Sequence, residues 1–414
     1  MINRIKGMYD ILPPDTAVWR RVEDAFLAVS RRYGFAEART PILERTELFS
    51  RSIGETTDIV EKEMYTFADK SERSLTLRPE GTASMVRAYI ENNVPASDAA
   101  AKWVYIGPMY RYERPQKGRN RQFSQLGAEV FGVDAASQDA ELIVMAWRFL
   151  ESLDLAGHVS LEINSLGDAE ERRRYREVLV GYLEGHRAVL CEDCVRRLGA
   201  NPMRVLDCKM EACSAVAAGA PMLLDHIDGA SRTHFDALRR GLEAAGVPYA
   251  VNPRIVRGLD YYNRTAFEFK TGELGAQDAI GGGGRYDGLV AELGGPPTPA
   301  VGFALGLDRV VLLLGGSAVE AAKLDFYVAP LSEAAQTTAV ALSDRLRKDG
   351  LIGEVDFSGR RLKHLFARAE RRGARTVLIL GDDELAKGVV QARDMAAKTQ
   401  REIRIDDLSR RTLG

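Results

Sequence analysis

The sequence predicts a multidomain protein of mixed helices and strands, with a helical insertion and a compact α/β domain at its end. The chain has 414 residues, enough for two to four domains of roughly 150 residues each. A segment rich in Arg and Glu at helical spacing interrupts a region of strand-like patterns. After residue 323, strand and helix patterns alternate, which is typical of a sheet with parallel strands.

The composition is that of an ordinary globular protein. Lys and Arg number 57 and Asp and Glu 59, a net charge of −2, and apolar residues make up 45%. These values exclude a mainly disordered chain, and four cysteines cannot staple a chain this long as a secreted disulfide scaffold. No apolar run approaches the roughly 20 residues that span a bilayer, and the first ten residues show no signal-peptide core. We therefore expect a cytoplasmic enzyme or binding protein without a membrane partner.

The first part of the chain begins with a helix and continues with strands. Apolar residues recur every three or four positions from Val18 to Tyr33, the period of an amphipathic helix, and Gly34 ends it. The patterns that follow predict an extended segment, two strands, a helix and a strand, at residues 40–49, 103–106, 125–131, 138–153 and 158–163.

A change in composition after Gly167 indicates an insertion over residues 168–228, which holds all four cysteines. A helix is expected near Ser231, and glycine-bounded patterns at 252–270 and 277–288 predict hairpin strands. Small residues at 299–314 are read as a helix. The expected domains are residues 1–167 with 229–317, the insertion 168–228, and the last domain 324–414.

The last domain is predicted as βαβαβ. Its strands are expected at 325–329, 353–357 and 376–380, with helices at 332–348 and 361–372 between them. Residues 324–414 carry 17 basic and 14 acidic side chains, so +3, which leaves −5 for the rest of the chain. This asymmetry has the sign expected of a polyanion binder, although a solvated helical face fits it equally well.

A basic and aromatic segment at residues 102–122 is the clearest candidate for chemistry. Six basic side chains stand there against one acid, Glu113, and tyrosines lie between them. Arginine presents a planar fork to phosphate oxygens, and an aromatic ring can stack on a base. The segment could hold a nucleoside phosphate, or it could be an exposed hairpin whose charges only keep it soluble.

Other polar motifs are weaker when taken singly. The turn 78–82 (RPEGT) could bind an ammonium group, and the segment 257–262 (RGLDYY) places an arginine beside acidic and phenolic groups. Gly281 to Gly284 match neither a dinucleotide-binding fingerprint nor a P-loop, so both are excluded. The five histidines lie outside these segments, which disfavours histidine-based catalysis and favours catalysis by positioning and charge neutralisation.

The cysteines form a spacing of C-x2-C followed by C-x4-C, from Cys191 and Cys194 to Cys208 and Cys213. Tetrahedral thiolate zinc is one interpretation of this clustering. Because the second pair is not C-x2-C, reduced thiols or a redox pair remain alternatives.

Together, the motifs resemble those of a class II aminoacyl-tRNA synthetase, and within that class a bacterial-type histidyl-tRNA synthetase. The segments similar to class motifs 1, 2 and 3 are 39–41 (RTP), 105–115 with 121–125 (YIGPMYRYERP, RQFSQ), and 300–309 (AVGFALGLDR). RGLDYY at 257–262 and GGGRYD at 282–287 resemble the two histidine-specific motifs. Ser124 stands where the family usually has histidine.

The resemblance implies an α+β catalytic domain, with an antiparallel sheet flanked by helices, and an α/β anticodon-binding domain. It implies a histidine–tRNA ligase that forms histidyl-adenylate from histidine and ATP and transfers histidine to tRNA(His). Mg²⁺ is expected with the ATP phosphates, a homodimer is expected through motif 1, and we assign no metal-ligating residues.

The resemblance also assigns roles by position. Arg111 is expected to bind the α-phosphate and the substrate carboxylate, and Arg257 to stabilise the pentavalent transition state, so these two are the candidate catalytic residues. The implied ATP-binding residues are Arg111, Glu113, Arg119, Phe123 and Arg309. The implied histidine-binding residues are Glu80, Gly81, Thr82, Arg111, Gln125, Glu129, Arg257, Tyr261, Tyr262 and Tyr286.

Three alternatives stand beside this assignment. A non-catalytic regulatory subunit of ATP phosphoribosyltransferase is similar to the catalytic domain, but it usually lacks both the last domain and the RGLDYY arginine. A synthetase for another amino acid is disfavoured by RGLDYY and Glu129, and a tRNA-binding module without catalysis is disfavoured by the intact set of arginines.

Overall fold

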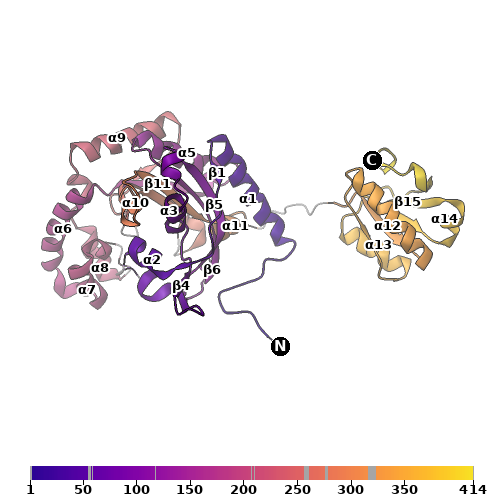
Figure 1. Cartoon of the computed structure of the whole chain (residues 1–414), viewed down its shortest axis with the longest axis horizontal. Helices are drawn as coiled ribbons and strands as arrows, with labels where there is room; N and C mark the ends of the chain where they lie inside the picture. Colours follow the sequence, from indigo (N-terminus) through magenta and orange to yellow (C-terminus); the bar gives the residue numbers. More distant parts are fainter. Residues whose placement is uncertain are drawn as a thin grey trace. The chain divides into compact units, whose positions relative to one another are not determined.

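The computed structural model describes residues 2–54, 57, 59–116, 118–206, 208, 210–255, 261–275, 278–315 and 323–413. The chain divides into two compact units, residues 1–317 and 318–414, which are drawn in Figure 1. Within the described ranges no helix is both long enough and apolar enough to cross a membrane.

An eight-stranded sheet forms the centre of the first unit. Its six inner strands pair antiparallel, while the short strands at the two edges pair parallel to their neighbours. The predicted antiparallel sheet flanked by helices is therefore confirmed. In spatial order the strands are β1 (Ala36–Glu37), β5 (Lys102–Tyr110), β6 (Gln122–Phe131), β11 (Ala300–Gly306), β10 (Ala279–Arg285), β9 (Asn263–Lys270), β7 (Ser160–Ser165) and β8 (Ala250–Val251).

Alternation along the strands separates the two faces of this sheet. In β6, Leu126, Ala128 and Val130 belong to the larger apolar core, while Gln125 and Glu129 point to the opposite face. Helices rich in apolar residues cover the first of these faces and bury it. They are α1 (Asp15–Arg32), α5 (Ala136–Glu151), α9 (Gly229–Ala244) and α11 (Leu307–Leu313).

The opposite face carries shorter elements and leaves room for a site. A small antiparallel sheet and four short helices lie on this side of the chain's first unit. Their bounds are β2 (Leu43–Arg45), β3 (Tyr65–Ala68), β4 (Ser74–Leu77), α2 (Thr46–Ile53), α3 (Thr82–Glu91), α4 (Val94–Ser97) and α10 (Leu289–Glu292).

The helix predicted over residues 299–314 is wrong in its first half. Residues 300–306 form strand β11, which pairs with both β6 and β10, and the helix begins only at Leu307. Small residues suggested a helix, but Val301, Phe303 and Leu305 alternate with glycine and alanine. A period of two is typical of a strand, and here one face of the strand carries only glycine and alanine.

The insertion consists of α6 (Ala169–Glu184), α7 (Glu192–Ala200) and α8 (Glu211–Ala218). The buried Glu171 carboxylate accepts hydrogen bonds from the backbone N–H groups of Asp168 (2.6 Å) and Asp228, and from the Ser231 hydroxyl (2.6 Å). One carboxylate thus joins the beginning of α6 to the beginning of α9. The two ends of the insertion therefore lie side by side.

The second unit contains a five-stranded sheet, in the order β13-β12-β14-β15-β16. Strands β13, β12 and β14 are parallel, which confirms the predicted βαβαβ pattern. The antiparallel hairpin of β15 and β16 extends the sheet, and no sequence pattern indicated it. The elements are β12 (Phe326–Pro330), α12 (Glu333–Lys348), β13 (Gly353–Val355), α13 (Leu362–Arg371), β14 (Thr376–Leu380), α14 (Asp382–Lys387), β15 (Val389–Asp394), β16 (Gln400–Arg404) and α15 (Arg410–Leu413).

A fully buried ion pair fixes the main sheet to α5. The Arg285 guanidinium, at the end of β10, donates to the Asp139 carboxylate of α5. Asp139 also accepts from the Thr265 hydroxyl and from His234 (2.9 Å). Burial alone would raise the pKa of Asp139, but the His234 hydrogen bond and the Arg285 charge hold it below its ordinary value.

Removing one partner of this pair is expected to cost more than removing a surface charge. Arg285→Met leaves Asp139 buried without its cation, and we expect a loss of about 3–5 kcal/mol in the free energy of unfolding. The control Arg173→Ala, in an exposed pair with Glu170, should leave the free energy of unfolding nearly unchanged. The measurement is urea unfolding followed by circular dichroism. Equal effects of the two substitutions would contradict the assigned role of the pair.

Candidate active site

A pocket of about 320 Å³ opens over the middle of the main sheet, on the face opposite α1 and α5. Strands β6, β9, β10 and β11 form its floor, and the loop between β5 and β6 forms one wall. The floor lacks bulky side chains because Gly282, Ala304 and Gly306 occupy the strand positions that face the pocket. A ligand can therefore lie directly against the backbone of the sheet.

A buried carboxylate lies behind one end of this pocket. Glu129 is fully buried and accepts hydrogen bonds from the Thr82 hydroxyl (2.8 Å) and the Tyr286 hydroxyl. Burial raises the pKa of Glu129 to about 8. Gly302 stands opposite Glu129 on β11, and a Cβ there would overlap the carboxylate. The glycine is thus required by the acid beside it.

Glu80 has a second role beside its place in the pocket lining. Its carboxylate accepts from the backbone N–H groups of Thr82 (2.7 Å) and Ala83 (2.8 Å), in the first turn of α3. Burial raises the pKa of Glu80, while these two backbone donors oppose the rise. The negative charge lies at the positive end of the helix dipole, which holds Glu80 in a fixed position.

Three polar atoms around this end are buried without a hydrogen-bond partner among the described residues. They are the hydroxyls of Tyr105 and Tyr261 and the Oε1 atom of Gln125. Buried polar groups are normally paired, and Gln125 and Tyr261 line the pocket, so a polar ligand or a water molecule there would complete them. The Tyr105 ring fits between Gly81 and Gly127, where any Cβ would strike it. Gly81 therefore contributes by leaving room for the Tyr105 ring, and it does not itself line the pocket.

Arginines line the other end of the pocket. Arg111 donates to the Pro79 carbonyl (2.8 Å), and its guanidinium carbon lies 5.2 Å from the centre of the Phe123 ring. Arg119 donates to the Glu113 carboxylate (3.1 Å), which also lies 3.9 Å from Arg111. One acid thus holds two arginines at the mouth of the β5–β6 loop. Arginine forks and an aromatic ring suit a nucleoside phosphate.

Arg309 completes the positive end from the opposite side of the pocket. It donates to the carbonyls of Gly118 (3.1 Å) and Ala279, which direct it from α11 toward the β5–β6 loop. Burial lowers the pKa of Arg309, and the like charge of Arg119 lowers it further. Like charges held together in a partly buried site favour an anionic ligand, because its charge relieves their repulsion.

The structure brings most of the predicted site residues together. Glu129 and Tyr286 lie behind the pocket wall, and Arg257 lies outside the described residues, as does Lys117 of the basic segment. All five predicted ATP-binding residues line the pocket: Arg111, Glu113, Arg119, Phe123 and Arg309. Five further predicted histidine-binding residues line it too: Glu80, Thr82, Gln125, Tyr261 and Tyr262.

Several lining residues were missed by the sequence analysis. Glu268 lies between Phe267 and Phe269 on β9, and this alternation could have placed its carboxylate on the pocket face. Asn120 lies in the β5–β6 loop and has no distinguishing pattern. Ala304 and Gly306 were hidden by the incorrect helix prediction.

Comparison with known proteins agrees with this geometry. A family model described as Histidyl-tRNA synthetase matches residues 7–310, and one described as Anticodon binding domain matches residues 325–412. A histidine–tRNA ligase of Nitratidesulfovibrio vulgaris (strain DP4) is 50% identical over 413 residues, covering 100% of this chain and 98% of the relative. One of Geobacter metallireducens is 50% identical over 406 residues, covering 98% of each chain.

A solved structure shows the same fold. The crystal structure of apo S. aureus histidyl-tRNA synthetase superposes with a TM-score of 0.81 at 36% identity, covering 98% of both chains. Sequence, family models and fold agree over nearly the whole length, and the chain therefore belongs to the histidyl-tRNA synthetase family.

Proposed function

We propose that this chain is a histidine–tRNA ligase. It activates histidine with ATP to histidyl-adenylate and pyrophosphate, then transfers histidine to the 3′ end of tRNA(His). The observation that carries the proposal is one pocket with a carboxylate and tyrosines at one end and arginines at the other. The 50% identity to histidine–tRNA ligases supports this catalytic assignment over the regulatory-subunit alternative.

Histidine recognition is assigned to the buried end. Glu129 and a tyrosine hydroxyl pair with the two imidazole nitrogens, and Glu80 and Thr82 receive the ammonium group. Another amino acid brings no ring nitrogens to these groups and loses both hydrogen bonds, so the pocket favours histidine. The unpaired polar atoms of Tyr261 and Gln125 support this assignment, because a polar ligand satisfies them.

Activation is assigned to the arginine end. The histidine carboxylate attacks the α-phosphate in line, and Arg111 neutralises charge on both groups while Phe123 and Glu113 hold the adenine. Arg119 and Arg309 take the γ-phosphate, and Arg257 stabilises the pentavalent transition state. Mg²⁺ would neutralise charge on the ATP phosphates, and the Glu268 carboxylate in the pocket lining could supply it with an oxygen ligand.

The parts of the chain are assigned to separate tasks. Residues 1–167 with 229–317 carry the chemistry, 168–228 form an insertion, and 324–414 bind the anticodon. The loop after β13 exposes Phe357 beside Arg360 and Arg361. An exposed aromatic ring with cations suits unstacked RNA bases, which supports RNA binding by this loop.

A homodimer in the cytoplasm is also proposed. Ile42 and Leu43, next to the motif 1 segment, are 41% and 38% exposed, and apolar side chains there suit a covered subunit interface. The four cysteines form no disulfide, which suits a reducing compartment.

The decisive test of the function is ATP–pyrophosphate exchange with the purified chain and each of the twenty amino acids. We expect exchange with histidine alone, followed by charging of tRNA(His). Exchange with another amino acid would refute the specificity. No exchange with any amino acid would instead favour the non-catalytic regulatory alternative.

Arg257→Ala is expected to lower the rate of histidine activation by roughly 100- to 1,000-fold, because a cation that stabilises transition-state charge is lost. The binding of tRNA should be unchanged. Arg187→Ala, in an exposed pair with Glu184, is the matched control. The measurements are single-turnover adenylate formation and filter binding of tRNA. Near-wild-type activation by the variant would refute the assigned role.

Glu129→Gln is expected to change how stability depends on pH. The pKa of Glu129 is about 8 in the folded protein and 4.5 ordinarily. Its contribution to stability is therefore full below about 4.5 and is lost as the pH rises through about 8. The glutamine cannot titrate. As the pH rises from about 4.5 to about 8, the melting temperature of the ligand-free variant should therefore rise relative to that of the wild type. A difference that is constant with pH would contradict the assignment.

The same variant tests recognition directly. The KM for histidine should rise about tenfold or more, because a charge-assisted hydrogen bond to imidazole is lost. The KM for ATP should stay close to that of the wild type.

A further inference from the structure

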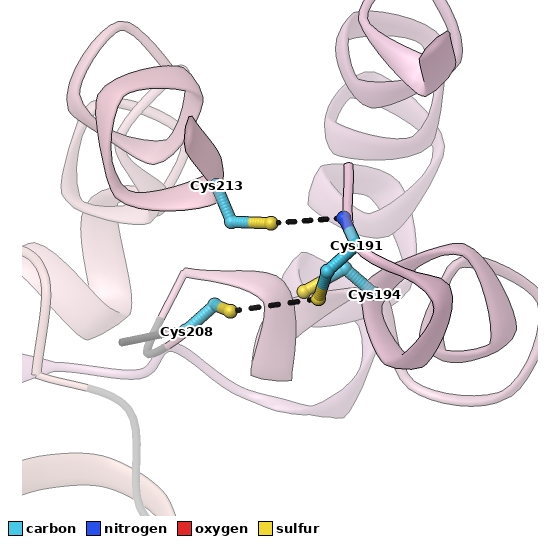
Figure 2. A group of neighbouring side chains, drawn as sticks. All are labelled: Cys191, Cys194, Cys208 and Cys213. Carbon is cyan, nitrogen blue, oxygen red and sulfur yellow. Dashed lines mark hydrogen bonds between the residues drawn. The ribbon is translucent and has the colours of Figure 1, made fainter. Parts of the chain in front are cut away.

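The insertion brings all four cysteines of the chain into one cluster, shown in Figure 2. The four Sγ atoms lie within 4.8 Å of one another, and those of Cys191 and Cys208 are 3.9 Å apart. Four thiolates around zinc, each at about 2.3 Å, stand about 3.8 Å from one another. We propose that Cys191, Cys194, Cys208 and Cys213 bind one structural zinc ion.

The distances disfavour the alternatives that the sequence left open. A disulfide needs two sulfurs at about 2.05 Å, whereas the four cysteines are free and converge on one point. A redox pair uses only two thiols, so it does not explain why all four cysteines lie together. Four protein ligands close a tetrahedron and leave no position for substrate, so the proposed ion has a structural role.

The local backbone favours thiolates at these positions. Cys191 caps α7 and Cys194 lies in its first turn, while Cys213 lies in the first turn of α8. Helix N-termini stabilise negative charge. Three of the four sulfurs thus lie at helix ends whose N–H groups favour thiolates, the form that binds zinc.

A metal would add to the stability that the apolar core gives the insertion. Helix α7 has nine residues and α8 has eight, lengths that are marginal without tertiary support. The backbone N–H of Cys191 donates to Cys213 Sγ at 3.2 Å, which is the contact between these two helices drawn in Figure 2. Small modules with little core are commonly stabilised by a metal. Zinc would join the N-termini of α7 and α8 to the segment at Cys208.

The insertion that carries the cluster contacts the rest of the first unit through α8 and through α6. Arg254 donates to the carbonyls of Ala217 (3.2 Å) and Ala218 (2.5 Å), at the end of the helix that carries Cys213. On α6, Arg172 donates to the Tyr262 carbonyl (2.7 Å). The insertion thus contacts both Arg254 and Tyr262, and Tyr262 lines the pocket. Loss of zinc should therefore weaken histidine binding as well as the insertion itself.

The test begins with the metal content of the full-length chain, purified under reducing conditions without chelator. Elemental analysis should find one zinc per chain, released when a mercurial reagent titrates four thiols. Replacement by Co²⁺ should give the intense visible bands of tetrahedral thiolate coordination. This measurement needs no variant, so it does not depend on whether a substituted chain folds.

Variants then assign the ligands. Cys208→Ser should lose the zinc and make residues 168–228 the first site of limited proteolysis, while its melting temperature falls. Glu211→Gln, an exposed change in the first turn of α8, should keep one zinc. The proposal is overturned if the purified chain holds no metal and takes up none from buffered zinc while its four thiols stay reactive. Disulfides in a metal-free chain that retains its thermal stability would overturn it too.

Discussion

The pocket exists because the middle of the main sheet carries glycine and alanine where its flanks carry large side chains. Gly302 leaves the space that the Glu129 carboxylate occupies, and Gly282, Ala304 and Gly306 leave the space that a ligand occupies. A single Cβ on Gly302 would displace this buried acid. The rest of the site depends on this constraint, since the polar side chains can converge only where the sheet itself is bare.

Buried carboxylates lie at one end of the pocket and arginines at the other, and different interactions position the two sets of side chains. Burial raises the pKa of Glu129 at one end, so this end favours a partner that stabilises the charge of the carboxylate. At the other end, Glu113 restrains Arg111 and Arg119 only partly, and Arg309 feels their repulsion. An imidazole at one end and phosphates at the other match both conditions. Histidine bound beside ATP has this arrangement of groups.

The sequence was most informative where the pattern had one physical meaning. The β5–β6 hairpin and the βαβαβ domain could be predicted because alternation and helical spacing were clear. Residues 300–306 were misassigned because small residues fit both a helix and a bare strand. The roles of Arg285 and Glu80 could not be predicted from local sequence. The partner Asp139 lies 146 residues from Arg285, and only the fold shows that Glu80 accepts from the first turn of α3.

Because both ends of the insertion meet at Glu171, the remainder of the first unit is continuous without it. A short turn from β7 to α9 would close the chain and leave the register of the eight strands unchanged. Such a module can change in length or sequence between relatives at little cost to the sheet. The cost falls instead on the Arg172 contact to the Tyr262 carbonyl, which any replacement module would have to restore.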